Sequence, residues 1–211
     1  MISHKTVGRC GSLLACALAF AGTASAAPSS QIIDGRTSIR LATEFLDTLA
    51  ANGFEMTNIL PGGIFPTETP PRVSFPVPTG EFDEAGPEVE IVHYGGILLS
   101  DGSTSVAVTT LIFDSFNIVD GKLNVTGIVK SNDSIVGRGN LFRITLSGAP
   151  VVTPESGTTA GRVVISDGDV RLTGTGANSL NAALGLTDVL TAGMKIGIAN
   201  VNVRFRDRDG N

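Results

Sequence analysis

The spacing of hydrophobic and polar residues changes twice along this chain, and each change predicts a short helix. Residues 36–41 alternate between apolar and polar positions, as in a half-buried strand. From Leu41 to Leu49 the apolar residues instead share one helical face, and Asn52-Gly53 is expected to end that helix. A second helix is predicted at about residues 177–184. The two helices therefore interrupt a chain that otherwise favours strands.

The rest of the chain has the two-residue period and the turn residues of antiparallel β-structure. Strands are expected around residues 73–77, 89–93, 106–113, 116–119, 123–129, 141–146, 162–165, 170–172 and 196–205. Asp120-Gly121 and Asp167-Gly168-Asp169 predict turns, and Gly95-Gly96 is expected to break or bend a strand. Prolines mark an edge loop at about residues 61–88. We expect an all-β fold, an antiparallel β-sandwich with two short α-helices.

Residues 1–26 have the composition of a secretory signal peptide. Lys5 and Arg9 belong to a basic start, an apolar run follows, and Ala24-Ser25-Ala26 gives the small-x-small pattern of a cleavage site. The apolar run is shorter than the roughly 20 residues that a membrane-spanning helix needs. We therefore expect one β-sandwich domain, residues 27–211, that is exported to the periplasm or the extracellular space. No transmembrane segment is expected after signal cleavage.

Cleavage at this site would leave a chain with few reactive side chains. Both cysteines, Cys10 and Cys16, would be removed; processing as a lipoprotein before Cys16 is the alternative. A cysteine-free mature chain has no disulfide, no thiol nucleophile and no cysteine-liganded metal. His93 would be its only histidine, which excludes a zinc site of several histidines. The formal net charge of −5, the single Tyr and the absence of Trp disfavour nucleic acid as a partner.

The remaining motifs have ordinary structural explanations. Gly174-Thr175-Gly176 opens the predicted second helix but lacks the third glycine of a dinucleotide fingerprint. Gly137-Arg138-Gly139-Asn140 is expected to connect strands rather than to bind phosphate. Aspartates are common in turns because they cap their own backbone, so calcium binding by these turns stays open. A carboxylate pair could make a hydrolase, an alternative that a chain without Trp disfavours for sugars. We expect no enzyme.

His93 and Tyr94 form the candidate binding pair. They are adjacent in one predicted strand, so their side chains point to opposite faces. Imidazole and phenolate both ligate haem iron, which makes the two residues candidate haem ligands. The structural alternative is a core histidine with a satisfied hydrogen bond beside a half-exposed tyrosine. The sequence does not identify a metal ion that this pair would bind.

The order of features over residues 36–185 resembles the HtaA-type haem-uptake domain of secreted and surface-attached bacterial proteins. The matching pieces are Phe45 in a short helix, Gly53, Phe75-Pro76, Gly80-Glu81-Phe82-Asp83, His93-Tyr94-Gly95-Gly96-Ile97-Leu98, Leu123, Leu172-Thr173, Ala177 and Asn181. The resemblance implies an iron-ligating tyrosine three residues after the helix phenylalanine, supported by the histidine of a His-Gly-Gly strand. Thr48 stands at the ligand position here, and Tyr94 is inserted into the strand motif. The resemblance therefore carries over to His93 alone.

These observations predict an exported, non-catalytic protein that acts as a binding module or as an extracellular structural or surface module. Its partner would be an unknown protein or a cell-surface ligand, with no cofactor. The candidate surface is the strand Glu88 to Gly96 with the acidic segment before it. One alternative is a haem-binding module of the HtaA type that uses the His93/Tyr94 strand. A carboxylate-based hydrolase is the second alternative.

Overall fold

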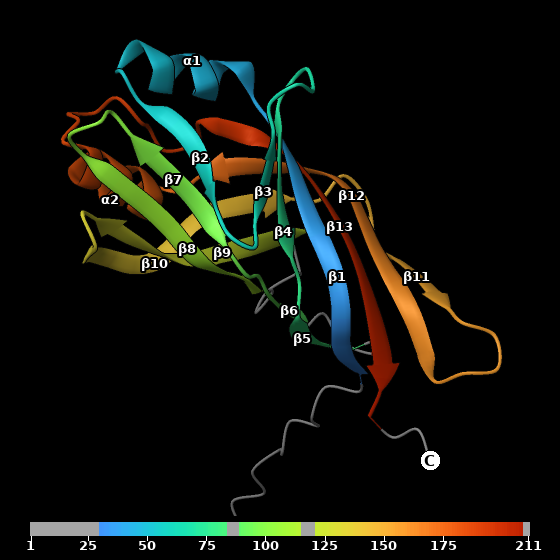
Figure 1. Ribbon diagram of the computed structural model, residues 1–211. Coiled ribbons are helices and arrows are strands. Elements are labelled where there is room, and N and C mark those ends of the chain that lie inside the picture. The colour runs from blue at the N-terminus through green and yellow to red at the C-terminus, as the bar shows by residue number, and fades with distance from the viewer. Residues whose placement is uncertain (1–29, 84–88, 115–120, 209–211) are drawn as a thin grey trace, which may run out of the picture.

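The computed structural model describes residues 30–83, 89–114 and 121–208, which form strands and two helices (Figure 1). The strands are β1 (Ser30–Leu41), β2 (Glu55–Ile59), β3 (Gly63–Phe65), β4 (Arg72–Pro76), β5 (Thr79–Phe82), β6 (Val89–Val92), β7 (Gly96–Ser100), β8 (Ser105–Asp114), β9 (Lys122–Ser131), β10 (Ser134–Thr145), β11 (Val151–Pro154), β12 (Ala160–Leu172) and β13 (Lys195–Asp207). The helices are α1 (Thr43–Ala51) and α2 (Gly174–Leu184). The predicted signal peptide lies outside the described residues.

Eight of the described strands close into one antiparallel ring. Its order is β1, β13, β12, β10, β9, β8, β6 and β5, and β5 pairs with β1 again. The expected antiparallel β-fold with two short helices is confirmed. The sandwich arrangement is not confirmed, because hydrogen-bonded pairing continues around the whole ring and makes one barrel-like sheet rather than two separate sheets.

The wall of the ring is split beyond the β5–β6 hairpin. On one side of the split, β4, which precedes β5 in the chain, pairs with β1 and with β3. On the other side, β7, which follows β6, pairs with β8 and with β2. The expected break at Gly95-Gly96 is confirmed, since β6 ends at Val92 and β7 begins at Gly96. No hydrogen-bonded pairing joins β2 to β3 among the described residues. The wall is therefore split between these strands, and α1 lies across that end of the molecule (Figure 1).

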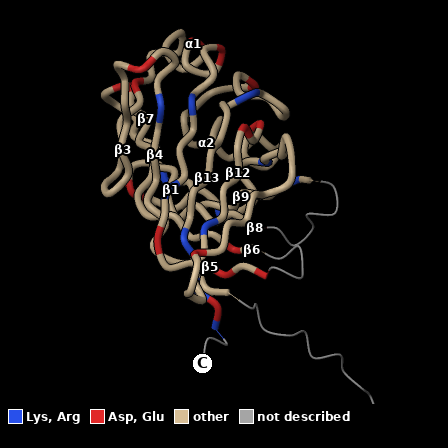
Figure 2. The backbone as a smooth tube through the Cα atoms, turned by 90° about the vertical axis from the view of Figure 1, so that its right-hand side faces the viewer, with Lys and Arg blue, Asp and Glu red and all other residues tan. Residues whose placement is uncertain are grey.

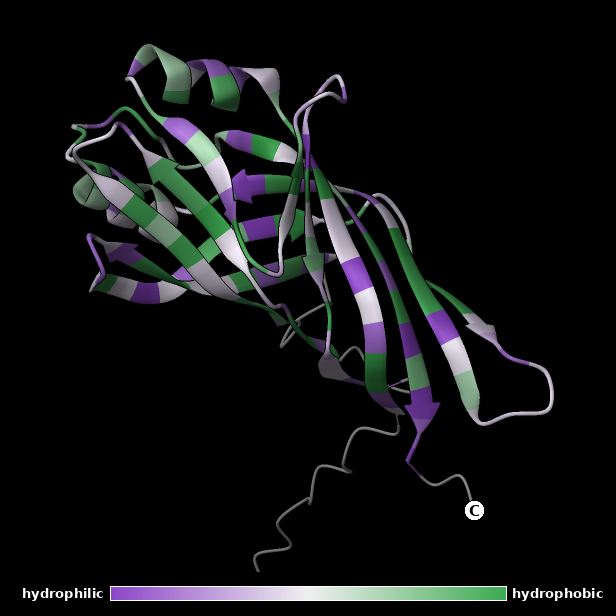
Figure 3. Cartoon of the chain, in the orientation of Figure 1, coloured by the Kyte–Doolittle hydropathy of each residue, from purple (hydrophilic) through white to green (hydrophobic). Residues whose placement is uncertain are grey.

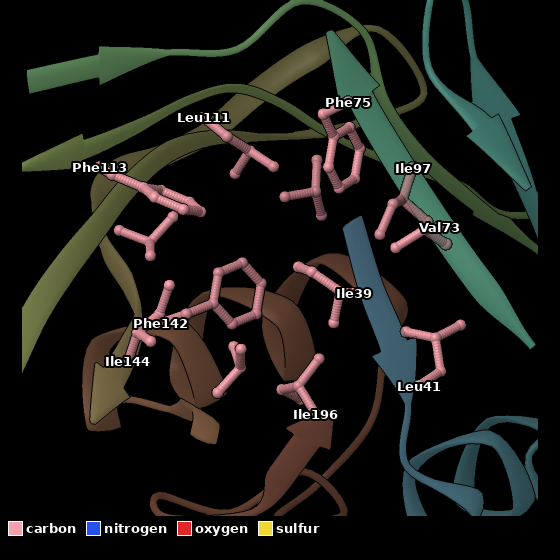
Figure 4. Close-up of a pocket in the computed structure, with 13 residues that line it drawn as sticks. Ile39, Leu41, Val73, Phe75, Ile97, Leu111, Phe113, Phe142, Ile144 and Ile196 are labelled. Atoms are coloured by element: carbon pink, nitrogen blue, oxygen red, sulfur yellow. The ribbon is translucent and has the colours of Figure 1, made fainter. Parts of the chain in front are cut away.

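Inward-facing apolar side chains fill the ring. Buried residues occupy alternate positions along β8 and β9, and hydrophobic and hydrophilic positions alternate along β1, β12 and β13 (Figure 3). Phe75, Phe113 and Phe142 point into one interior space, where 13 residues line a cavity of about 30 Å³ (Figure 4). All of these side chains are apolar, so this small cavity is expected to hold no water.

Both helices end at residues that can stop a helix, but only α2 has a side-chain cap at its start. Phe45 and Leu49 bury one face of α1, which ends just before Asn52 as expected. Thr173 caps α2 by accepting a 2.9 Å hydrogen bond from the Gly176 amide, so this helix starts three residues earlier than expected. An αL glycine, Gly185, ends α2.

Two turn or connection expectations are wrong. Asp167-Gly168-Asp169 lies inside β12, where a bulge opposite β13 replaces the expected turn. Gly137-Arg138-Gly139-Asn140 lies inside β10, and a Cβ on Gly139 would come within 3.3 Å of Thr175 in α2. Its glycines therefore face the helix. The expected strand 116–119 and Asp120 lie outside the described residues, while β8 and β9 on either side of them pair as expected.

Ion pairs join strands on the outer surface. Arg204 in β13 pairs with Asp34 in β1 at 3.3 Å and with Glu155 after β11 at 3.4 Å, and Arg208 pairs with Glu81. Figure 2 shows acidic and basic residues together near the β5 end of the molecule. None of the described helices is both long and apolar enough to cross a membrane.

Candidate functional site

His93 lies inside the ring, at the bend between β6 and β7. Its side chain is 3% exposed and packs against two aromatic rings. The Phe113 ring centroid is 4.2 Å from that of His93, and the Phe75 centroid is 6.4 Å away in an edge contact. Because Phe75 and Phe113 also line the interior cavity, His93 belongs to the wall of the apolar core.

Both ring nitrogens of His93 are engaged by the protein. Nδ1 lies 3.1 Å from the Leu111 carbonyl oxygen, and Nε2 lies 2.7 Å from Thr37 Oγ1. A carbonyl only accepts, so Nδ1 carries the proton, and the Thr37 hydroxyl donates to Nε2. Burial lowers the pKa of His93 to about 4, which keeps the imidazole neutral at pH 7. As arranged, His93 has no free nitrogen for an iron atom.

Tyr94 follows His93 in the segment between β6 and β7, and its side chain points to the opposite side of the backbone. Its side chain is 54% exposed, and its backbone N–H donates a 3.0 Å hydrogen bond to the Pro76 carbonyl. The expected opposite orientation of the pair is thus observed. The structure does not bring the two side chains to one ligand, because one is in the core and the other is in solvent.

Thr48, where the resemblance expects the iron-ligating tyrosine, is bound to its own helix. Its hydroxyl donates a 2.7 Å hydrogen bond to the Glu44 carbonyl oxygen. Threonine is also shorter than tyrosine and has no phenolate. The positions of Thr48, His93 and Tyr94 therefore do not fit a haem iron held between α1 and the His93 strand.

An apolar groove of about 280 Å³ lies beside α1, at the split between β2 and β3. Its buried floor is formed by Leu41, Leu49 and Phe54. Its walls are Leu46, Ala50, Met56, Ile64, Pro66 and Pro71. None of these side chains is charged. The groove combines α1 with segments from three other parts of the chain, so no local motif in the sequence marked it.

The solved structures that are similar to this fold include three that match it over most of its length. The C-terminal domain of HtaA from Corynebacterium glutamicum has a TM-score of 0.59 at 14% identity, covering 84% of this chain and 99% of that domain. The haem-binding protein HtaB from the same organism gives 0.55 at 14% identity, covering 83% and 95%. The N-terminal domain of HtaA gives 0.52 at 12%, covering 82% and 97%. The chain has an HtaA-like fold.

The resemblance to HtaA-type domains is thus confirmed at the level of the fold. No family model and no curated protein matches the sequence. Low identity to the HtaA and HtaB structures leaves the side chains of each site free to differ. Within this HtaA-like fold, the α1 groove and the His93 position are therefore assessed from the residues of this chain.

A polar depression of about 370 Å³ lies on the other side of β2 and is lined in part by Glu55 and Asp101. One Asp101 carboxylate oxygen accepts hydrogen bonds from the Ser103 amide, the Ser103 hydroxyl and the Thr104 amide. These bonds lower the pKa of Asp101 and hold the turn between β7 and β8. Among the described residues, no group of three or more His, Cys, Asp or Glu is placed to hold a metal.

Proposed function

We propose that this protein is a non-catalytic binding module whose ligand is a flat molecule of the haem class, with its apolar ring held in the α1 groove. The groove is the observation that carries the proposal, because it is open, has no charged lining residue and lies beside a helix at the end of the ring. The fold supports the choice of ligand, since HtaB, which shares it, binds haem.

The groove suits such a ligand because binding would remove apolar surface from water on both sides. Leu46 and Ala50 belong to the helix wall, and Met56 and Ile64 belong to the two strands that face it. Burial of apolar surface contributes about 2.5 kcal/mol for each 100 Å². The buried floor beneath holds these walls in place before a ligand arrives, which limits the entropy lost on binding.

The non-catalytic part of the proposal is supported by the structural roles of two titratable groups, His93 and Asp101. His93 is neutral, buried and bonded through both nitrogens. The Asp101 carboxylate holds its own turn. General acid–base catalysis needs such groups to be free to exchange a proton with a substrate.

Export belongs to the same proposal and rests on the pattern of residues 1–26. A module of this kind would bind its ligand outside the cytoplasm. Protein partners and cell-surface ligands stay a prediction of the sequence.

Titration of the purified protein with haem, followed in the Soret band, tests the proposal. Two neighbouring alanines of α1 give a matched pair, because Ala50 lines the groove while Ala51 is exposed outside it. We expect saturable binding that Ala50→Arg weakens more than about tenfold and Ala51→Arg leaves within a factor of about three. Absence of saturable binding, or equal effects of the two variants, would contradict the proposal.

A further inference from the structure

The groove has almost no side-chain atom that could ligate iron. Met56 is its one lining residue with a side-chain heteroatom, a neutral thioether sulfur. Thioethers are weak acceptors, and free imidazole or phenolate groups are stronger ligands for ferric haem. The remaining walls present only hydrocarbon.

The stronger candidate ligands cannot reach the groove as the chain is folded. His93 is inside the ring with both nitrogens bonded. Tyr94 lies five residues along the chain from Leu99, the partner of Met56 in the β2–β7 ladder. The same ladder pairs Gly96 with Ile59, at the end of β2 farther from α1, and Tyr94 precedes Gly96 by two residues. Tyr94 therefore lies beyond the opposite end of β2 from α1.

We infer that the groove recognises a porphyrin by its apolar ring and not by its iron, so that metal-free protoporphyrin binds about as tightly as haem. This inference rests on the proposed function and assigns the groove a ligand class, tetrapyrroles with or without a metal. It also distinguishes this groove from a site in which a tyrosine binds the haem iron.

The test compares two ligands on the same purified protein. Haem is followed by its Soret absorbance and protoporphyrin IX by its own red fluorescence. We expect the two dissociation constants to agree within about tenfold. Met56→Leu keeps the groove apolar and removes the sulfur, so it should change neither constant by more than about tenfold. Ala50→Arg should weaken both, and Ala51→Arg neither.

The outcomes separate this inference from the proposed function. Haem binding more than about tenfold tighter than protoporphyrin IX would overturn the inference while the binding function stands. Loss of that difference in Met56→Leu or in Tyr94→Phe would then identify the iron ligand. Failure of both ligands to bind would overturn the proposed function and the inference with it. If both ligands bind and Ala50→Arg weakens neither of them, the groove is not the binding site.

Discussion

The Thr37 hydroxyl in β1 donates a 2.7 Å hydrogen bond to Nε2 of His93, across the interior of the ring. Thr37 is fully buried and His93 is 3% exposed, so neither group has access to water. The bond connects β1 with the bend after β6, two segments that do not pair with each other. A buried polar pair of this kind is neutral and satisfied, and each partner depends on the other.

Thr37→Val is expected to destabilise the fold, because it leaves His93 Nε2 buried without a partner. The expected loss is about 1–3 kcal/mol in the free energy of unfolding. His93→Leu leaves the Thr37 hydroxyl unpaired in the same way, while Leu111 O keeps its bond from the backbone N–H of residue 93. Urea unfolding of both single variants and the double variant measures the coupling. The double variant should lose clearly less free energy of unfolding than the two single variants added together. Additive losses would contradict a direct interaction between Thr37 and His93.

Acid should weaken the fold through His93. Burial lowers the pKa of His93 from 6.5 to about 4, so the unfolded chain binds its proton more readily than the folded chain. The associated stability is complete above pH 6.5 and falls as the pH falls toward 4, by about 3 kcal/mol in all. About 2 kcal/mol of it should be lost between pH 7 and pH 5.

Urea unfolding at pH 7 and pH 5 measures this loss, with His93→Leu as the control. Carboxylates titrate in both proteins, whereas only the parent chain can protonate His93. The parent should therefore lose about 2 kcal/mol more than the variant over this interval. Parallel losses in the two proteins would show that residue 93 does not carry the pH dependence.

The fold could be predicted from the sequence as far as local patterns determine it. The period change at Leu41 located α1 within two residues, and Gly95-Gly96 marked the break between β6 and β7. Ring closure could not be predicted, because it depends on pairs such as Ser30 with Asp207, which lie far apart in the chain. Five of the described strands were not predicted. Of these, β2, β3 and β11 lie at sheet edges and have few buried residues. The other two, β5 and β7, pair on both sides but are only four and five residues long.

The site was harder to predict than the fold. The opposite directions of His93 and Tyr94 followed from strand geometry, and the structure places one in the core and one in solvent. The hydrogen bond from Thr37 spans 56 residues and has no local signature. The α1 groove consists of common apolar residues, so it becomes visible only once β2 and β3 are known to separate.

The small interior cavity predicts a stabilising substitution. Val125 lines the cavity, so Val125→Ile should place its added methyl group there and raise the free energy of unfolding by about 0.8 kcal/mol. Val129 is the matched control, because it is on the same face of β9 and fully buried but does not line the cavity. Val129→Ile should overpack the core and lower stability by about 1–3 kcal/mol. Thermal or urea unfolding measures the stability of both variants. If Val125→Ile destabilises the protein as Val129→Ile does, the cavity does not have room for the added methyl group in solution.

Close packing of α2 on β10 predicts that Gly176 tolerates no side chain. A Cβ at this position would lie 2.1 Å from the Leu141 carbonyl oxygen, which belongs to backbone and cannot move aside easily. Gly176→Ala should therefore shift α2 and destabilise the fold by roughly 2 kcal/mol or more, although alanine favours a helix. Gly174 starts the same helix and has open space around its Cβ position, so Gly174→Ala should be neutral or stabilising by up to about 1 kcal/mol. Urea unfolding of both variants measures the contrast. Similar stability of the two would mean that contact with β10 does not fix the position of α2.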